Sequence, residues 1–83
     1  MQRLLISYEL LEPNWTEMTR KVLYEELASL GAIQIQDSVW VTNTGISVAY
    51  ASTKLRTHFG KTDRLLVALL GDDIRSYEGL HAI

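Results

Sequence analysis

Four short stretches of the chain have the pattern of β-strands. Residues 3–9 and 32–36 alternate between apolar and polar side chains, as half-buried strands do. Residues 38–42 are rich in β-branched and aromatic side chains, which favour strands. Residues 63–70 contain an apolar run without alternation, so this last strand should be apolar on both faces. In the first strand, one face carries Leu4, Ile6 and Tyr8, and the other carries Leu5, Ser7 and Glu9.

Two segments between these strands have helical spacing. The first is predicted as a helix over 15–30, capped by Asn14 with Glu17 three residues later, and ended by Gly31. Its apolar positions are Trp15, Met18, Val22, Leu27 and Leu30. The second helix should begin after Ser47 and stop at Gly60. Its apolar face is predicted to carry Val48, Ala51, Leu55 and Phe59.

The order of these elements predicts the fold. Asp37 lies in a tight connection between two strands, and residues 43–45 and 71–73 are turn clusters. The resulting βαββαβ order, with short connections and right-handed crossovers, favours an α+β ferredoxin-like sandwich. In that fold two helices cover one face of a four-stranded antiparallel sheet. We expect one domain over residues 1–83, with its core in 3–70 and a C-terminal tail in 71–83.

The apolar last strand also predicts how the chain associates. In the expected fold this strand lies at a sheet edge, and a long apolar edge promotes aggregation unless something covers it. Either the tail or a second copy of the chain covers it, and we expect a symmetric homodimer formed through the last strand and the open face of the sheet. The predicted interface residues are Leu65, Val67, Leu69 and Trp40.

Charge and composition narrow the range of functions. The 83 residues contain 8 basic and 10 acidic side chains, a net charge of −2, which disfavours strong nucleic-acid binding. The material for a phosphate-binding surface is Arg20, Lys21, Lys54, Arg56, Lys61 and Arg64. We predict Lys54, Arg56, Lys61 and Arg64 as the nucleic-acid contacts, the first three lying around the end of the second helix. The chain has no cysteine, which excludes disulfides and thiolate metal sites. Its apolar runs are too short for a secretory signal or a membrane span, so we expect a cytoplasmic protein without membrane contact.

Glu9 is the sharpest candidate for chemistry. It ends the first predicted strand, and a carboxylate delivered to the end of a strand is a common way for small nucleases to hold a metal ion. Glu12 could join such a site, and a solvated acid at each position is the alternative. His58 is expected to interact with a helix C-terminus. The turn acids Asp72 and Asp73 could bind a hard cation or simply face water.

Four segments together resemble a known family. In order along the chain, they are residues 5–10, 29–31, 38–41 and 62–67, with sequences LISYEL, SLG, SVWV and TDRLLV. They resemble the small CRISPR-associated adaptation subunit and its endoribonuclease-like relatives, especially the SinR-type branch. The resemblance covers most of residues 3–70. It implies a dimeric ferredoxin-like protein that acts near nucleic acid, in mobile-element defence or counter-defence.

The resemblance also defines two competing functions. In nucleases of this family, an aspartate after a tyrosine ends the first strand, and one from each subunit is thought to hold a divalent metal. Glu9 stands at that position here. The chain would then be a magnesium- or manganese-dependent endonuclease acting on RNA or DNA. However, glutamate replaces aspartate, and Glu12 and Pro13 follow where arginines are usual. These departures favour a non-catalytic relative that binds nucleic acid or protein, for example as an antagonist of a defence complex.

Overall fold

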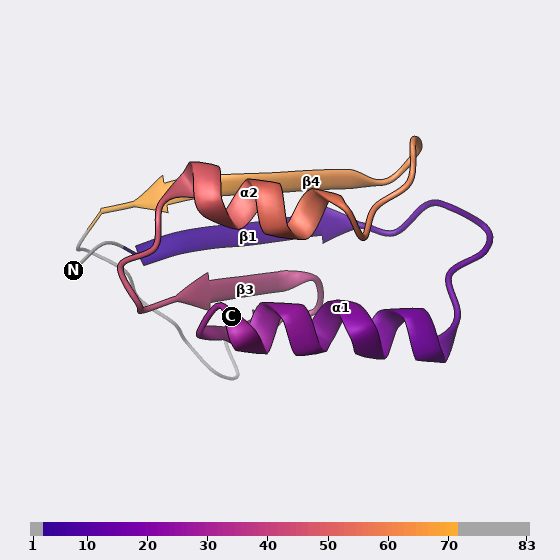
Figure 1. The fold of residues 1–83 in the computed structure, drawn as a ribbon, viewed down its shortest axis with the longest axis horizontal. Helices are drawn as coiled ribbons and strands as arrows, with labels where there is room; N and C mark the ends of the chain where they lie inside the picture. Colours follow the sequence, from indigo (N-terminus) through magenta and orange to yellow (C-terminus); the bar gives the residue numbers. More distant parts are fainter. Residues whose placement is uncertain (1–2, 72–83) are drawn as a thin grey trace, which may run out of the picture.

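A computed structural model describes residues 3–71, and its elements follow the predicted order. They are β1 (Arg3–Glu9), α1 (Glu17–Ser29), β2 (Ala32–Gln36), β3 (Val39–Thr42), α2 (Val48–Arg56) and β4 (Arg64–Leu70). The strands form one antiparallel sheet in the order β2-β3-β1-β4, so β4 lies at an edge as predicted. Both helices lie on the same side of this sheet (Figure 1). The predicted ferredoxin-like arrangement is thereby confirmed.

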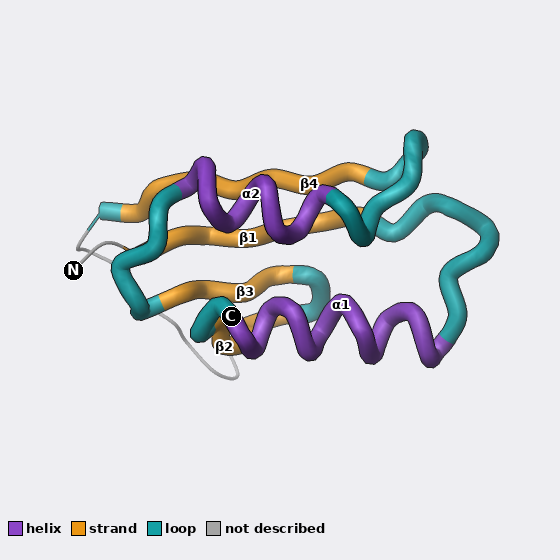
Figure 2. Tube along the Cα trace, in the orientation of Figure 1, coloured by secondary structure: helices purple, strands orange, loops and turns teal. Residues whose placement is uncertain are grey.

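Strand register assigns each side chain to one of two faces. Directly opposed residues of an antiparallel pair point to the same face. Ile6 lies opposite Trp40 on β3 and Val67 on β4, so these three share the face under the helices. Ser7 lies opposite Val39 and Leu66, so these share the other face. Figure 2 shows β2 beside β3, at the edge of the sheet away from β4.

The core lies between the sheet and the helices. It consists of Leu4, Ile6 and Tyr8 from β1, Leu23, Leu27 and Leu30 from or beside α1, Ala32, Trp40, Ala51 and Leu55. Two buried hydrogen bonds satisfy the polar groups in this core. The Trp40 indole N–H donates to the Tyr8 hydroxyl at 2.9 Å, and the Leu4 amide donates to the Thr42 hydroxyl at 3.0 Å. Since burial raises the pKa of the Tyr8 phenol, this hydroxyl stays protonated over the ordinary pH range.

The start and the buried face of α1 differ from the prediction. The N-cap is Thr16, not Asn14, and its hydroxyl accepts from the Thr19 amide at 3.1 Å. The Thr19 hydroxyl accepts in turn from the Thr16 amide at 2.8 Å, which completes a capping box with threonine in place of Glu17. Trp15 therefore precedes the helix.

Met18 and Val22, predicted to face the core, are exposed, and Leu23 is buried instead. The periodicity explains the error. With 3.6 residues per turn, Val22 lies about 140° around the helix from Leu27, whereas Leu23 lies only about 40° away. The buried face is thus Leu23, Leu27 and Leu30. Beyond them Gly31 has φ of 77°, as its predicted role at the helix end requires, and a Cβ there would collide with Thr44.

The second helix begins as predicted and ends early. The Ser47 hydroxyl accepts from the Tyr50 amide at 3.0 Å, which caps α2. The helix ends at Arg56, and the chain continues through a turn in which the His58 amide bonds to the Leu55 carbonyl. Phe59 is therefore outside the helix but still packs against the core. Gly60 follows this turn and does not itself end the helix.

Candidate functional site

Glu9 lies at the end of β1, on the face of the sheet away from the helices. Its strand partner is Arg64, and the Arg64 Nη1 atom is 3.6 Å from the Glu9 carboxylate. Both side chains are largely exposed, 59% for Glu9 and 75% for Arg64. An exposed ion pair of this kind is weak, so it leaves Glu9 accessible while partly compensating its charge.

The structure separates the candidate metal ligands. Glu12, proposed to join Glu9, lies in the loop after β1, where the Thr62 hydroxyl donates to its carboxylate. It lines a hollow on the helix side, whereas Glu9 lines a different one with Ser7 and Arg64. Within residues 3–71, no group of three or more potential ligands comes together. Asp72 and Asp73, the other predicted cation site, lie outside the described residues.

The four basic residues do not form one phosphate-binding surface. Arg64 is on the open side of the sheet, opposite Glu9. Lys54 is on α2, on the helix side, with its ammonium 5.9 Å from the centre of the Tyr50 ring. Arg56 is at the exposed end of α2, and Lys61 is in the following loop. The four predicted contacts are therefore divided between the two sides of the sheet, with Arg64 apart from the other three.

The predicted interface residues lie on the helix-covered face. Leu65 and Val67 pack against the core, opposite Tyr8 and Ile6. Leu69 shares this face but is exposed, opposite Leu4. Trp40 is a correction: it is 8% exposed and buried under the helix layer, so a single chain does not present it for contact with a second copy.

The other face of the sheet is apolar and uncovered within residues 3–71. The prediction placed the dimer contact on the last strand and the open sheet face, but the residues it named lie on the helix-covered face. We call it the open face, and it consists of Leu5, Ile33, Val39, Val41, Leu66, Ala68 and Leu70, with Ser7 near its centre. Ile33 is 67% exposed and Leu66 is 55% exposed. The charged residues Arg3, Glu9 and Arg64 lie at the strand ends, so the middle of the open face carries no charge.

Asp63, just before β4, is a structural residue that the sequence reading did not single out. Its Oδ1 accepts from the Leu11 and Glu12 amides at 2.7 and 2.8 Å. Its Oδ2 accepts from the Trp15 indole at 2.9 Å and the Gly60 amide at 2.8 Å. Although partial burial acts in the opposite direction, these N–H donors hold the pKa of the carboxyl below its usual range. Asp63 thus joins the loop after β1 to the loop before β4.

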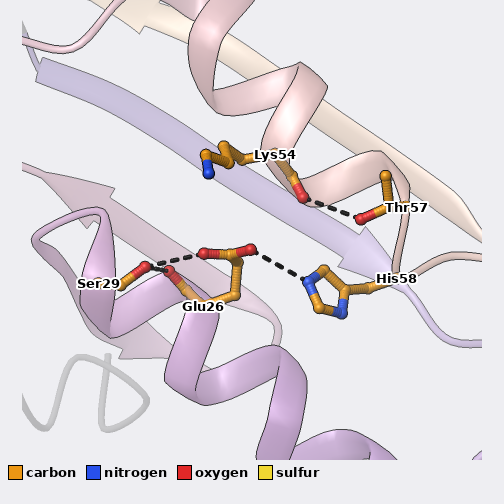
Figure 3. Close-up of polar contacts among 5 residues, drawn as sticks. All are labelled: Glu26, Ser29, Lys54, Thr57 and His58. Carbon is orange, nitrogen blue, oxygen red and sulfur yellow. Dashed lines mark hydrogen bonds and ion pairs between the residues drawn. The ribbon is translucent and has the colours of Figure 1, made fainter.

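Another polar contact joins α1 to the turn that follows α2. The Glu26 carboxylate on α1 accepts from the Ser29 hydroxyl at 2.8 Å and lies 3.3 Å from His58 Nε2, beyond the end of α2 (Figure 3). Lys54 lies nearby on α2. The Ser29 hydrogen bond, followed by that of His58, lowers the pKa of Glu26. His58 therefore contacts a carboxylate on the neighbouring helix.

Comparisons with known proteins add no family assignment, since neither the protein-family models nor the curated proteins contain a match to this chain. Neither helix in the described part of the chain has the length and apolar character that crossing a bilayer requires. The site must therefore be interpreted from its own geometry.

Proposed function

We propose that this chain is a non-catalytic protein-interaction module that associates with a second copy of itself through the open face. The open face carries the proposal, because apolar side chains cross all four strands there and no part of residues 3–71 covers them. Exposed apolar patches of this kind on soluble proteins usually mark interaction sites. The sequence resemblance suggests that such a module acts in mobile-element defence or counter-defence.

A second copy of the chain matches the open face in width and character. Sheets stack face to face about 10 Å apart, with side chains from the two inner faces interdigitating. The four strands span about 19 Å, so a second four-stranded sheet would cover the full width of the open face. An identical face offers matching size, twist and apolar character, and symmetric dimers are the commonest oligomers.

The charges favour a protein partner over nucleic acid. The middle of the open face lacks the lysines and arginines that phosphate binding requires. Arg64 at its end is already opposite Glu9. Arg3 lies at the other end of the face, opposite Leu70. Lys54, Arg56 and Lys61 lie on the helix side or in the loop before β4.

Matched substitutions test the proposal. Ile33→Glu and Leu66→Glu place a charge on the open face, while Met18→Glu places one at a position that is 70% exposed on α1. Sedimentation equilibrium should give the mass of two chains for the parent and Met18→Glu, and of one chain for the open-face variants. A one-chain mass for the parent at micromolar concentration would overturn self-association.

One observation supports the metal-dependent endonuclease as a second candidate. Glu9 is exposed at the rim of the open face, so stacking two such faces would place both Glu9 carboxylates at the border of one interface. Magnesium or manganese held there would supply a Lewis acid for phosphodiester hydrolysis. The enzyme should cleave labelled RNA or duplex DNA only with added metal, and Glu9→Ala should abolish cleavage while Glu17→Ala retains it. Metal-independent cleavage, or cleavage retained in Glu9→Ala, would exclude this candidate.

A further inference from the structure

A hollow of about 260 Å³ lies on the helix side, away from the open face. The loop after β1, the first turn of α1 and the loop between α2 and β4 enclose it. These segments approach one another at the end of the molecule where β1 stops (Figure 1). The lining residues are Glu12, Asn14, Trp15, Thr19, His58, Phe59, Gly60 and Asp63. None of them takes part in the proposed self-association.

The walls of this hollow are fixed in place. Asp63 holds both loops through its four N–H donors, one of them the Trp15 indole. Trp15 packs edge-on against Phe59 with ring centres 6.0 Å apart, and Phe59 packs on Tyr8 of the core at 5.8 Å. A site built on such contacts needs little reorganisation when a ligand binds, which reduces the cost of binding.

The charges of the lining residues favour a positively charged ligand over an anion. The lining includes two carboxylates, Glu12 and Asp63, and no lysine or arginine. Asp63 is already saturated by N–H donors, so Glu12 is the available charge. Thr62 occupies one Glu12 oxygen, and the other lies against Gly60, where a Cβ would collide with it. The absence of a side chain at Gly60 therefore makes room for this carboxylate.

The aromatic walls and the size of the hollow favour an organic cation over a metal ion. Within the described residues, no set of three ligands gathers here for a metal. Guanidinium is planar and weakly hydrated, stacks on aromatic rings, and donates charge-assisted hydrogen bonds to carboxylate oxygens. The volume is below the usual range for drug-sized ligands, so it suits one such group. We propose that this hollow binds a guanidinium group next to Glu12, Trp15 and Phe59.

A guanidinium group could come from an arginine side chain of a protein or from a small free guanidine. Two-dimensional proton–nitrogen NMR titrations with a capped arginine tripeptide and with agmatine test both sources. The Trp15 indole and Gly60 amide signals should shift on saturation, while the Trp40 indole, buried in the core, serves as an internal control. Tighter binding of the peptide would identify a protein source, and tighter binding of agmatine a free guanidine.

Two controls make the test decisive. The matching citrulline peptide is neutral and nearly isosteric, so it should not shift these signals. Glu12→Gln should weaken binding at least about tenfold, because a charge-assisted pair is lost, whereas Glu17→Gln on the exposed first turn of α1 should leave it unchanged. An unchanged Trp40 signal in Glu12→Gln would confirm that its core is intact. Absence of shifts at millimolar ligand, or equal shifts with citrulline, would overturn the proposal.

Discussion

The two faces of the sheet differ in environment although the same strands supply both. On β1, Leu4 and Ile6 are fully buried under the helices, whereas Leu5 and Ser7 between them remain partly exposed on the open face. On β4, Val67 packs against the core while the neighbouring Leu66 is exposed. The covered face is completed within one chain, and the open face has an apolar middle but lacks a cover in residues 3–71. Stability should therefore depend on the first face and association on the second.

The largest effect should come from truncation on the covered side. Leu27→Ala removes a fully buried side chain from α1 and should lower the free energy of unfolding by about 2–5 kcal/mol. Leu66→Ala on the open face should cost less than about 1 kcal/mol in a dilute, dissociated sample, because that side chain is already exposed. Urea unfolding followed by circular dichroism measures both. Equal losses in the two variants would break the distinction between the faces.

Loss of the Asp63 hydrogen bonds should give the next largest decrease in unfolding free energy. Asp63→Ala removes the acceptor of four N–H groups and should cost about 2 kcal/mol of unfolding free energy. Asp63→Asn keeps one carbonyl oxygen and should cost less. Chemical denaturation gives both values, and the Trp15 indole signal in NMR spectra reports locally on the loops. An alanine variant as stable as the parent would show that these loops do not depend on the carboxylate.

Acid should weaken the carboxylate contacts of Asp63 and Glu26 on the helix side of the sheet. The pKa of Asp63 and that of Glu26 are lowered in the folded chain, so their contributions are complete above the unfolded values of about 3.9 and 4.3. These contributions are lost as the pH falls through the lower, folded values. The free energy of unfolding should thus decrease below about pH 4, and less steeply in Asp63→Asn combined with Glu26→Gln. An identical acid slope in that double variant would contradict the assignment.

The smallest effect should come from the rim of the open face. Arg64→Gln removes the ion pair with Glu9, and both side chains are mostly exposed. We expect a change below about 0.5 kcal/mol in unfolding free energy, because water and salt screen such pairs. Thermal unfolding at low and high salt would measure it. A loss above about 1 kcal/mol would mean that this pair is buried in an assembly.

Local sequence patterns were sufficient to predict the fold. It was harder to predict which face of each helix or strand is buried. The strands, the Ser47 cap and Gly31 follow from alternation, hydroxyl capping and positive φ, each determined by nearby residues. The face of α1 was predicted wrongly because Met18 and Val22 are apolar but point away from the sheet. The helical period relative to Leu27 favours Leu23 over Val22 on the buried face. Tertiary packing selects the face that is buried.

The contacts of the candidate site depend on residues that are distant in sequence. Asp63 bonds to Leu11 and Glu12, about fifty positions earlier, and no local pattern marks such a contact. Arg64 was predicted as a nucleic-acid contact together with Lys54, yet strand register places it opposite Glu9. Trp40 was predicted as an interface residue, and register places it beside Ile6 on the face under the helices. To predict these positions, one must know which strands pair and in which register, and the alternation of apolar and polar residues does not specify either.

The most direct test is to detect contacts between two copies of the chain by NMR. A mixture of carbon-labelled and unlabelled protein allows isotope-filtered measurement of proton–proton contacts that arise only between subunits. If a second copy covers the open face, such contacts should involve the methyl groups of Leu5, Val41 and Leu66, and not those of the buried Leu23 and Leu27. Contacts restricted to the helices, or no contacts between subunits at micromolar concentration, would contradict the central claim.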